Sequence, residues 1–559
     1  MNYMKIYQCW LTETTENTEI CSELRAIEND EVAIEDRFYR ELEFGTGGLR
    51  GVLGAGTNRM NVYTVSKATQ GYSNYLKKQT AHPVVAIGYD SRINSTLFAQ
   101  TAAAVFAANG IQVHIYPKLM PTPAVSFAVR DLKCDGGVVI TASHNPSKYN
   151  GYKVYGNDGC QITTEAAKAI QQEIDAVDVF SDVCHADFHG MVECGLIRYI
   201  GEETVNHYHE ALDTASVLAE DISKDVAIVY TPLNGAGISC VPRCLQEHGF
   251  TNITIPAEQG TPDGNFPTCP YPNPEIREAL TVGLEWAKRT GSDLLLATDP
   301  DCDRVGVAVK NGEDYVLING NEMGVLLLDF ICKMRLERGS MPKNPVAVKT
   351  IVTTPMAARV AAHYGVQLVD VLTGFKFIGE QIGLLEQNGE ANRYIFGFEE
   401  SYGYLSGSFV RDKDAVNASL LICEMFAYYQ EQGKSLVDVL AELYETYGFF
   451  ETRLMTFAFE GSAGFTKMQE MIQGLRDHRL EKIAAFDVEK IVDYKNDETG
   501  LPKSNVLKFF LKGGLEAVVR PSGTEPKLKV YLTAMGETKR ASVAAVDTLS
   551  SYFEDWAKA

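Results

Sequence analysis

The sequence lacks any long hydrophobic run. No window approaches the roughly 20 uninterrupted apolar residues that a helix needs to span a bilayer. Residues 1–19 also lack the basic segment followed by an apolar segment that marks a secretory signal. We therefore expect a cytoplasmic protein that is neither exported nor inserted into a membrane.

An excess of basic residues is missing as well, because the formal net charge is -22. Sequence-independent binding to nucleic acid or to an anionic membrane needs a basic field, so neither partner is expected. The 12 cysteines are scattered without CxxC pairs or the spacing of zinc ligands, as in a protein with reduced thiols. No obligate protein partner is inferred, and an anionic substrate must meet a local basic pocket.

The length of 559 residues predicts several domains rather than a single core. Strand-like and helix-like segments alternate through most of the chain, which indicates α/β domains with their chemistry at strand ends. From about residue 447 the pattern changes to successive strands closed by a helix, which is typical of a smaller antiparallel α+β domain. The expected domains span 1–208, 209–322, 323–446 and 447–559.

A serine follows a short β-branched run at residues 136–140. The chain continues as Thr-Ala-Ser-His-Asn-Pro, with the serine at 143, and the Asn-Pro pair predicts an immediate turn. A second turn at Asn150-Gly151 is expected to bring Lys153 back towards Ser143. A serine beside a basic side chain can exchange a phosphoryl or acyl group, although this stretch alone is more typical of an ordinary strand end.

Three carboxylates, Asp299, Asp301 and Asp303, occupy alternate positions between two apolar strands. Carboxylates this close repel one another unless a cation lies between them. A calcium EF-hand is excluded, because Arg304 and Lys310 stand where that loop needs glycine and glutamate. Three oxygen ligands with room for a phosphoryl oxygen favour Mg²⁺, and a solvated acidic turn is the alternative.

Two further stretches are suited to binding phosphate. Residues 44–51 contain four glycines and Arg50. A dinucleotide-binding fingerprint is disfavoured, because Arg50 stands where that motif needs glycine. Backbone N–H groups and one guanidinium favour the binding of an anion instead. Residues 520–527 combine an arginine, a lysine, two hydroxyls and a glycine on one short loop.

A third kind of site is suggested at residues 399–401, where two glutamates and a serine follow a predicted strand. Acidic and hydroxyl side chains at a strand end can bind the vicinal hydroxyls of a sugar. A plain acidic turn is an equally good interpretation of this stretch alone.

Taken together, these stretches resemble the α-D-phosphohexomutase family, and residues 36–51 and 231–235 resemble its phosphoglucomutase-2/phosphopentomutase branch. The resemblance covers about residues 36–535. It implies three α/β sandwich domains and a smaller antiparallel α+β C-terminal domain around a central cleft. By motif, it implies a phosphorylated Ser143, metal binding by Ser143, Asp299, Asp301 and Asp303, and cleft or catalytic roles for Arg50, His144, Lys153, Arg304, Thr373, Gly374, Lys376 and Lys413. It also implies sugar contacts from Glu399 and Ser401, and a site for the non-reacting phosphate made by Arg520, Ser522, Gly523, Thr524 and Lys527.

The resemblance implies a Mg²⁺-dependent phosphoglucomutase that interconverts glucose 1-phosphate and glucose 6-phosphate through a phosphoserine and glucose 1,6-bisphosphate. Lys153 is then the expected general acid/base, with a pKa lowered by nearby positive charge. The Phe-Glu-Glu-Ser-Tyr sequence at 398–402 differs from the Gly-Glu-Met-Ser-Gly of dual phosphomannose enzymes, which disfavours phosphomannomutase activity. Phosphopentomutase and glucose-1,6-bisphosphate synthase activities stay open, and retention of the serine and three aspartates argues against a non-catalytic sugar-phosphate sensor.

Overall fold

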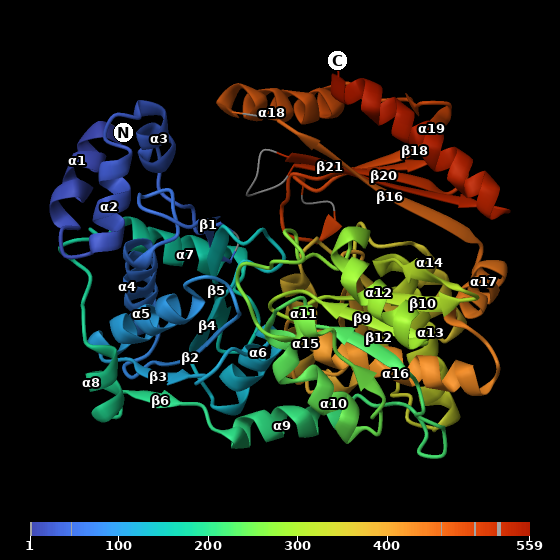
Figure 1. Ribbon diagram of the computed structural model, residues 1–559. Helices are drawn as coiled ribbons and strands as arrows, with labels where there is room; N and C mark the ends of the chain where they lie inside the picture. The colour runs from blue at the N-terminus through green and yellow to red at the C-terminus, as the bar shows by residue number, and fades with distance from the viewer. Residues whose placement is uncertain (1–2, 46, 460, 497–498, 522–526, 559) are drawn as a thin grey trace. The chain divides into compact units, whose positions relative to one another are not determined.

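The computed structural model describes residues 3–45, 47–459, 461–496, 499–521 and 527–558 (Figure 1). The chain forms two compact units. Unit 1 comprises Met1–Ile318, Gly379–Asn392 and Gly403–Tyr428, and unit 2 comprises Asn319–Ile378, Arg393–Tyr402 and Tyr429–Ala559. The span expected to form a third domain, 323–446, therefore contributes segments to both units.

Unit 1 begins with three short helices around a small apolar core of their own, which includes Trp10, Leu24 and Phe38. The side chains of Asn17 and Asp30 cap the second and third helices by accepting backbone N–H groups. These helices are α1 (Tyr3–Glu13), α2 (Thr18–Ala26) and α3 (Glu31–Phe38).

The first sheet of unit 1 has the strand order β1-β5-β4-β2-β3-β6. Strands β4, β2, β3 and β6 run parallel, whereas β5 pairs antiparallel with both β4 and β1. The strands are β1 (Gly48–Val52), β2 (Val84–Tyr89), β3 (Gln112–Ile115), β4 (Gly136–Ile140), β5 (Tyr149–Gly156) and β6 (Ile197–Tyr199).

Helices pack on both faces of this sheet. Apolar residues of α4 (Val62–Gln79), α5 (Ser95–Ala108) and α7 (Thr164–Asp175) share one core with β2 to β5. On the other face, α6 (Thr122–Asp131) lies so close to the strands that a Cβ at Gly88 would come within 2.3 Å of Val125 and one at Gly137 within 2.5 Å of Val129. The result is a three-layer α/β/α arrangement in which the parallel strands end at one edge.

The second sheet of unit 1 has the order β11-β10-β9-β7-β8. Strand β9 is parallel to β7 and antiparallel to β10, so β9 and β10 form a hairpin whose loop carries the three aspartates. The strands are β7 (Ile228–Thr231), β8 (Ile253–Thr254), β9 (Leu294–Thr298), β10 (Val305–Asn311) and β11 (Asp314–Ile318).

The remaining elements of unit 1 connect and cover these sheets. They are α8 (Phe188–Glu193), α9 (Glu202–Asp213), η1 (Ala236–Ser239), α10 (Val241–Glu247), α11 (Ala257–Gly260), η2 (Arg277–Leu280), α12 (Thr281–Thr290) and β15 (Gly403–Leu405). Three further elements contribute residues to both units: α15 (Phe375–Gln387), η3 (Ala391–Arg393) and α16 (Ala415–Glu431).

Unit 2 contains a parallel sheet in which β12 (Val346–Thr350) lies between β13 (Gln367–Val371) and β14 (Tyr394–Glu399). Helices α13 (Gly320–Glu337), α14 (Met356–His363) and α17 (Leu436–Tyr447) belong to the same unit. Asn319 and Glu322 form a capping box at the start of α13, in which each side chain accepts a backbone N–H of the other residue.

The C-terminal part of unit 2 is an antiparallel sheet of order β16-β21-β20-β19-β18-β17, with α18 and α19 packed on its apolar face. This arrangement confirms the predicted antiparallel α+β domain, with more strands than the sequence pattern indicated. Its elements are β16 (Phe449–Ala458), α18 (Gly461–Asp477), β17 (Lys482–Ile483), β18 (Phe486–Asp493), β19 (Leu507–Leu511), β20 (Leu515–Pro521), β21 (Lys527–Gly536) and α19 (Lys539–Lys558).

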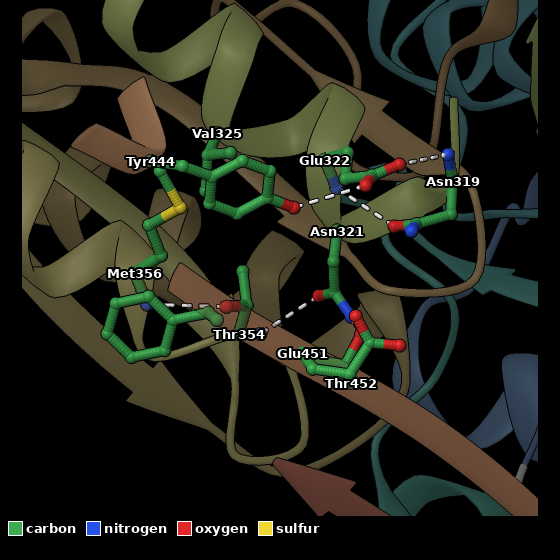
Figure 2. Close-up of a pocket in the computed structure, with 10 residues that line it drawn as sticks. Asn319, Asn321, Glu322, Val325, Thr354, Met356, Tyr444, Glu451 and Thr452 are labelled. Atoms are coloured by element: carbon green, nitrogen blue, oxygen red, sulfur yellow. Dashed lines mark hydrogen bonds between the residues drawn. The ribbon is translucent and has the colours of Figure 1, made fainter. Parts of the chain in front are cut away.

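A small cavity in unit 2 lies between the start of α13 and the start of β16 (Figure 2). The Asn321 side chain bridges its walls, since its Nδ2 donates to Thr452 Oγ1 at 3.1 Å and its Oδ1 accepts the N–H of Thr354 at 2.9 Å. The cavity measures about 20 Å³, which is enough for one water molecule but not for a sugar phosphate. This cavity is therefore too small to hold such a substrate.

In the part of the chain that the structure describes, no helix is long and apolar enough to cross a membrane.

Candidate functional site

Ser143 lies just beyond the carboxyl end of the buried strand β4. Its backbone adopts a left-handed conformation with φ of 51°, and its N–H donates to Thr141 Oγ1 at 2.8 Å. A non-glycine residue with this φ is uncommon and needs support from its surroundings. The turn aims the hydroxyl at the aspartate loop, where Ser143 Oγ donates to Asp299 Oδ2 at 3.0 Å.

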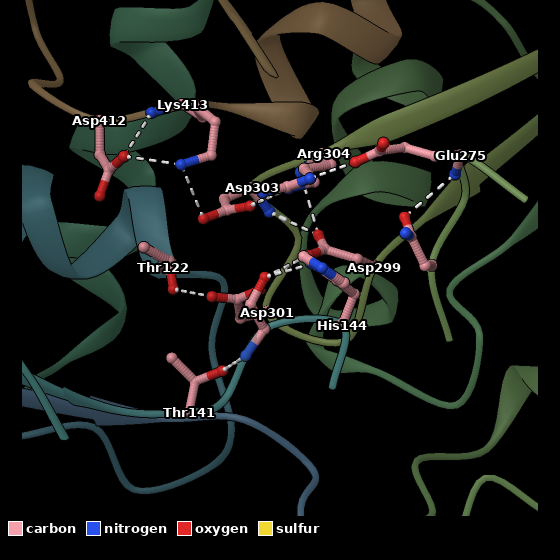
Figure 3. Close-up of polar contacts among 12 residues, drawn as sticks. Thr122, Thr141, His144, Glu275, Asp299, Asp301, Asp303, Arg304, Asp412 and Lys413 are labelled. Carbon is pink, nitrogen blue, oxygen red and sulfur yellow. Dashed lines mark hydrogen bonds and ion pairs between the residues drawn. The ribbon is translucent and has the colours of Figure 1, made fainter. Parts of the chain in front are cut away.

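Asp299, Asp301 and Asp303 lie on the β9–β10 loop, and one oxygen of each lies within 4.8 Å of the others. All three are at most 1% exposed. Backbone N–H groups of residues 303 and 304 donate to Asp299 Oδ1, each at 3.0 Å, which holds the loop in a tight turn. The alternate spacing predicted from the sequence thus becomes a convergent cluster of buried oxygens (Figure 3).

The donor set of this cluster fits a hard divalent cation. Asp301 Oδ1 and Asp303 Oδ1 are buried and have no hydrogen-bond partner among the described residues. Burial together with the charges of Asp301 and Asp303 raises the pKa of Asp299 well above its usual value. Buried carboxylate oxygens that accept no hydrogen bond and lie this close together are suitable ligands for Mg²⁺ or a similar ion.

Lys153 supplies part of the compensating charge. The antiparallel pairing of β4 with β5 places Lys153 opposite Val139, and its Nζ lies 2.7 Å from Asp301 Oδ2 and 3.1 Å from Asp303 Oδ2. The expected turn at Asn150-Gly151 is wrong, because these residues lie within β5. The chain reverses earlier, where the N–H of Tyr149 donates to the carbonyl of Pro146.

Without a cation among the aspartates, the pKa of Lys153 is raised, whereas the expected lowering depends on a bound Mg²⁺. Burial lowers this pKa, but Asp301 and Asp303 more than offset the effect and raise it above its usual value. Asp303 shows the reciprocal effect: burial opposes its ionisation, yet Lys153 and Lys413 hold its pKa below the usual range. A cation bound by the aspartates would remove the cause of the raised pKa of Lys153.

His144 provides a neutral base beside the serine. Its Nδ1 lies 3.1 Å from Ser143 Oγ. Burial and the charges of Arg304 and Arg50 lower the pKa of His144 well below its usual value. A neutral imidazole can accept the hydroxyl proton of Ser143 or keep that hydroxyl oriented.

Lys413 and Arg304 extend the positive rim of the cluster. Lys413 Nζ lies 3.1 Å from Asp303 Oδ2 and 3.4 Å from Asp412 Oδ1. Asp412 is itself held by the hydroxyl of Tyr155, which donates to its Oδ2 at 2.6 Å. Arg304 pairs with Glu275 (Figure 3). The sequence interpretation named Lys413 and Arg304 but missed Asp412, Tyr155 and Glu275.

Arg50 lies on β1, so residues 48–51 form part of a strand rather than the anion-binding glycine loop expected there. Gly48 pairs with Lys153 and has φ of 150°, and a Cβ there would come within 2.0 Å of the Tyr152 carbonyl. The glycine therefore permits a close strand approach. Arg50 is exposed, and its Nη1 donates to Asn145 Oδ1 at 3.3 Å, so its guanidinium lies beside the serine turn.

Unit 2 carries the residues expected to contact sugar and the second phosphate. Glu399 ends β14, is 7% exposed, and accepts the N–H of Gly374 at 2.9 Å, so these two predicted residues meet. Thr373 precedes α15, the buried Lys376 lies in its first turn, and Ser401 follows β14. Glu400 accepts from the hydroxyls of Thr350 and Thr353, each at 3.3 Å, which fixes the loop between Glu399 and Ser401.

The predicted phosphate loop is described only in part. Arg520 lies in β20, opposite Lys529 of β21, and Lys527 begins β21. The predicted ligands Ser522, Gly523 and Thr524 lie outside the described residues. Two strands of one hairpin therefore carry the two basic residues of this loop.

Arg92 is the residue of unit 1 that the sequence interpretation missed most completely. It follows β2, which is parallel to β4, and its guanidinium lies under the serine turn. Its position after a predicted buried strand could have identified it, because the carboxyl ends of parallel strands meet at one edge of a sheet.

Comparisons with known proteins agree with this arrangement. Models of the phosphoglucomutase/phosphomannomutase family match the chain in four places: α/β/α domain I at residues 41–179, domain II at 206–312, domain III at 319–447 and the C-terminal domain at 476–547. A phosphoglucomutase of Staphylococcus saprophyticus is 36% identical over 530 residues, which cover 92% of this chain and 93% of the relative. A phosphoglucomutase of Staphylococcus aureus USA300 is 36% identical over 515 residues, or 89% and 91% of the two chains.

Solved structures show the same fold. The phosphoglucomutase parafusin from Paramecium has a TM-score of 0.69 at 19% identity, with 93% of this chain and 96% of that chain covered. A phosphoglucomutase/phosphomannomutase family protein from Burkholderia thailandensis has a TM-score of 0.66 at 18% identity, with coverage of 92% and 97%. Identities this low bear on the fold alone.

Proposed function

Because the chain belongs to the phosphoglucomutase/phosphomannomutase family, we propose that it interconverts glucose 1-phosphate and glucose 6-phosphate through a phosphorylated Ser143. The enzyme is an isomerase that transfers a phosphoryl group. The observation that carries the proposal is the contact of Ser143 Oγ with Asp299 Oδ2 at 3.0 Å, within a buried group of three carboxylates.

The proposed reaction uses one serine twice. The phosphoryl group leaves Ser143 Oγ and bonds to the free hydroxyl of the sugar phosphate, which forms glucose 1,6-bisphosphate. The bisphosphate turns around, and its other phosphate bonds to Ser143 Oγ as the bond to the sugar oxygen breaks. The enzyme returns to its starting state, and the sugar leaves with its phosphate on the other carbon.

We place Mg²⁺ on Asp299, Asp301, Asp303 and an oxygen of the phosphorylated Ser143. When bound, the ion neutralises phosphoserine charge and polarises the transferring group. Lys153 reaches the same carboxylates and is our candidate to exchange the proton of the reacting sugar oxygen. Neutral His144 holds the Ser143 hydroxyl, and Lys413 and Arg304 offer positive charge to the phosphoryl oxygens.

The sugar-binding roles in unit 2 are part of the same proposal. The Glu399 carboxylate and the Ser401 hydroxyl would bind sugar hydroxyls, together with the loop of Thr373, Gly374 and Lys376. Arg520 and Lys527 would hold the phosphate that does not react, with Ser522, Gly523 and Thr524 as further ligands. We further propose domain boundaries near residues 208, 322 and 446.

The test is a coupled assay on glucose 1-phosphate and ribose 1-phosphate, each with and without glucose 1,6-bisphosphate. We expect turnover of glucose 1-phosphate that the bisphosphate stimulates and that chelation of divalent cations abolishes. Ser143→Ala serves as the inactive control. A higher kcat/KM for ribose 1-phosphate would replace this proposal with a phosphopentomutase, which the resemblance of residues 36–51 and 231–235 to that branch keeps as the second candidate.

A further inference from the structure

Arg92 lies beneath the turn that presents Ser143, and none of the chemistry described above uses it. It follows β2, whose last residue Tyr89 pairs with Ile140 at the end of β4. Because β2 and β4 are parallel neighbours, the residues that follow them emerge at the same edge of the sheet. Two positions 51 residues apart in sequence are thereby brought into contact.

The guanidinium binds four carbonyl groups of one short segment. Its Nη1 donates to the carbonyls of Pro146 and Tyr149, each at 3.0 Å. Its Nη2 donates to the carbonyl of Ser143 at 2.5 Å and to that of Asn145. The whole turn from the serine to the start of β5 is therefore held by the two ends of one planar group.

The surroundings keep this guanidinium in one place. Its side chain is fully buried, and its Nε lies 3.4 Å from Asp90 Oδ2, which supplies an equally buried negative charge. The ring of Phe266 lies 5.1 Å from the guanidinium carbon, an arrangement typical of a cation–π contact. Asp90 is fixed in turn, because its Oδ1 accepts the hydroxyl of Ser95 at 2.8 Å and the N–H of Arg92 at 2.9 Å.

The serine turn needs such support. Ser143 holds φ of 51°, a strained conformation that a non-glycine residue keeps only where its surroundings enforce it. The direction of Ser143 Oγ towards Asp299 depends on that conformation. Arg92 contacts only backbone carbonyls of the turn, and none of these four hydrogen bonds involves the Ser143 hydroxyl.

We propose that Arg92 is a positioning residue, which fixes the direction of Ser143 Oγ in both phosphoryl transfers by binding the carbonyls of the serine turn. The role in transfer rests on the proposed function, whereas the effect on the turn does not. Arginine suits this task because its planar fork carries five N–H donors in fixed directions, whereas a lysine ammonium is a point charge with three.

Arg92→Lys keeps the charge beside Asp90 and removes the fork. We expect kcat for the mutase reaction to fall about 10²-fold, the scale of a misplacement near 1 Å, with KM little changed because no substrate contact is lost. Phosphorylation of Ser143 by glucose 1,6-bisphosphate, followed by intact-protein mass spectrometry, should slow to a similar extent.

Amide hydrogen exchange provides the readout that does not depend on the sugar. In Arg92→Lys, exchange should become faster in peptides covering residues 141–150. It should stay unchanged in peptides from α4 and α7, which pack on the face of the sheet opposite α6. The matched control is Arg130→Lys. Arg130 also donates to a carbonyl, that of Asp158 at 3.0 Å, and to a carboxylate, that of Glu386 at 2.7 Å.

The outcomes separate the two claims. Unchanged exchange at 141–150, or faster exchange across the whole of unit 1, would overturn the positioning role, and so would a rise in KM alone. Faster exchange confined to 141–150 in a protein without activity on glucose phosphates would support the positioning and contradict the proposed function. Should Arg92→Lys fail to fold, the double variant Arg92→Gln/Asp90→Asn removes the fork together with its counter-charge and so leaves no unpaired buried charge. Unchanged exchange at 141–150 in that double variant would overturn the role.

Discussion

Lys153 is the side chain whose removal should reveal the charge state of the aspartate cluster most directly. Its Nζ contacts Asp301 at 2.7 Å and Asp303 at 3.1 Å, and its side chain is only 12% exposed. Lys153→Gln leaves three buried carboxylates with Lys413 as the remaining ammonium partner of Asp303. The variant should therefore be less stable, and it should bind a divalent cation with less competition.

The expected loss follows from the burial of the pair. Removing one partner of a buried ion pair costs about 3–5 kcal/mol, because the other charge stays buried without compensation. In the folded protein the pKa of Lys153 is raised and that of Asp303 is lowered. The contribution of Lys153 to folding stability is present below its unfolded-state pKa, near 10.4, and is lost as the pH rises through its folded-state pKa. The contribution of Asp303 is present above its unfolded-state pKa, near 3.9, and is lost as the pH falls through its folded-state pKa. The loss in the variant should be largest near neutral pH and should shrink as acid protonates the aspartates.

The measurement is denaturant unfolding of wild type and variant in chelator and in Mg²⁺. A cation at 100 times its Kd stabilises the folded state by about 2.7 kcal/mol, so Mg²⁺ should restore much of what Lys153→Gln loses. The matched control is Lys349→Gln, because the buried ammonium of Lys349 pairs with Asp370 at 3.0 Å within unit 2 and contacts none of the three aspartates in that pair. Equal stability of Lys153→Gln and wild type in chelator would refute the reasoning, as would an equal gain from Mg²⁺ in both variants.

Three further predictions concern turnover. Ser143→Ala should abolish mutase activity while leaving the unfolding transition in place, and near-normal activity would show that another group carries the phosphoryl. Glu399→Gln should reduce kcat/KM for glucose 1-phosphate more than for ribose 1-phosphate, because a site built to bind hydroxyls discriminates by up to about 10⁴ to 10⁵; equal losses would remove Glu399 from sugar selection. Tyr155→Phe removes the 2.6 Å hydrogen bond to Asp412 and leaves a buried acceptor unpaired, at a cost of about 1–3 kcal/mol. Because Asp412 contacts Lys413, the substitution should disturb Lys413 and lower kcat. A kcat equal to that of the wild type would contradict this role.

The aspartate cluster was predictable from the sequence because its geometry is local. Asp299, Asp301 and Asp303 lie within five residues of one loop, and the apolar runs on either side predicted the strands that hold it. The serine at the end of β4 was predictable for the same reason. The order of these motifs along the chain was enough to suggest the family and its four-domain fold.

The tertiary structure alone decided what surrounds those motifs. The direction in which the pKa of Lys153 is shifted depends on carboxylates about 150 residues away along the chain. No local sequence pattern contains that information. The same holds for Asp412 and Tyr155, which are separated by 257 residues. Residues 44–51 resembled a glycine loop because their glycines are evident in the sequence, whereas the pairing of residues 48–51 with β5 is not.

The sequence by itself determined the chemistry available to this protein: a serine, three carboxylates and the basic residues expected to contact phosphate, each placed by short-range spacing. Only the tertiary structure determined how that chemistry is oriented and how its charge is balanced. The parallel pairing of β2 with β4 brings Arg92 under the serine turn, and the antiparallel pairing of β4 with β5 returns Lys153 to the aspartates. Strand pairing joins residues that are far apart in the chain, so its consequences for orientation and pKa appear only in the folded protein.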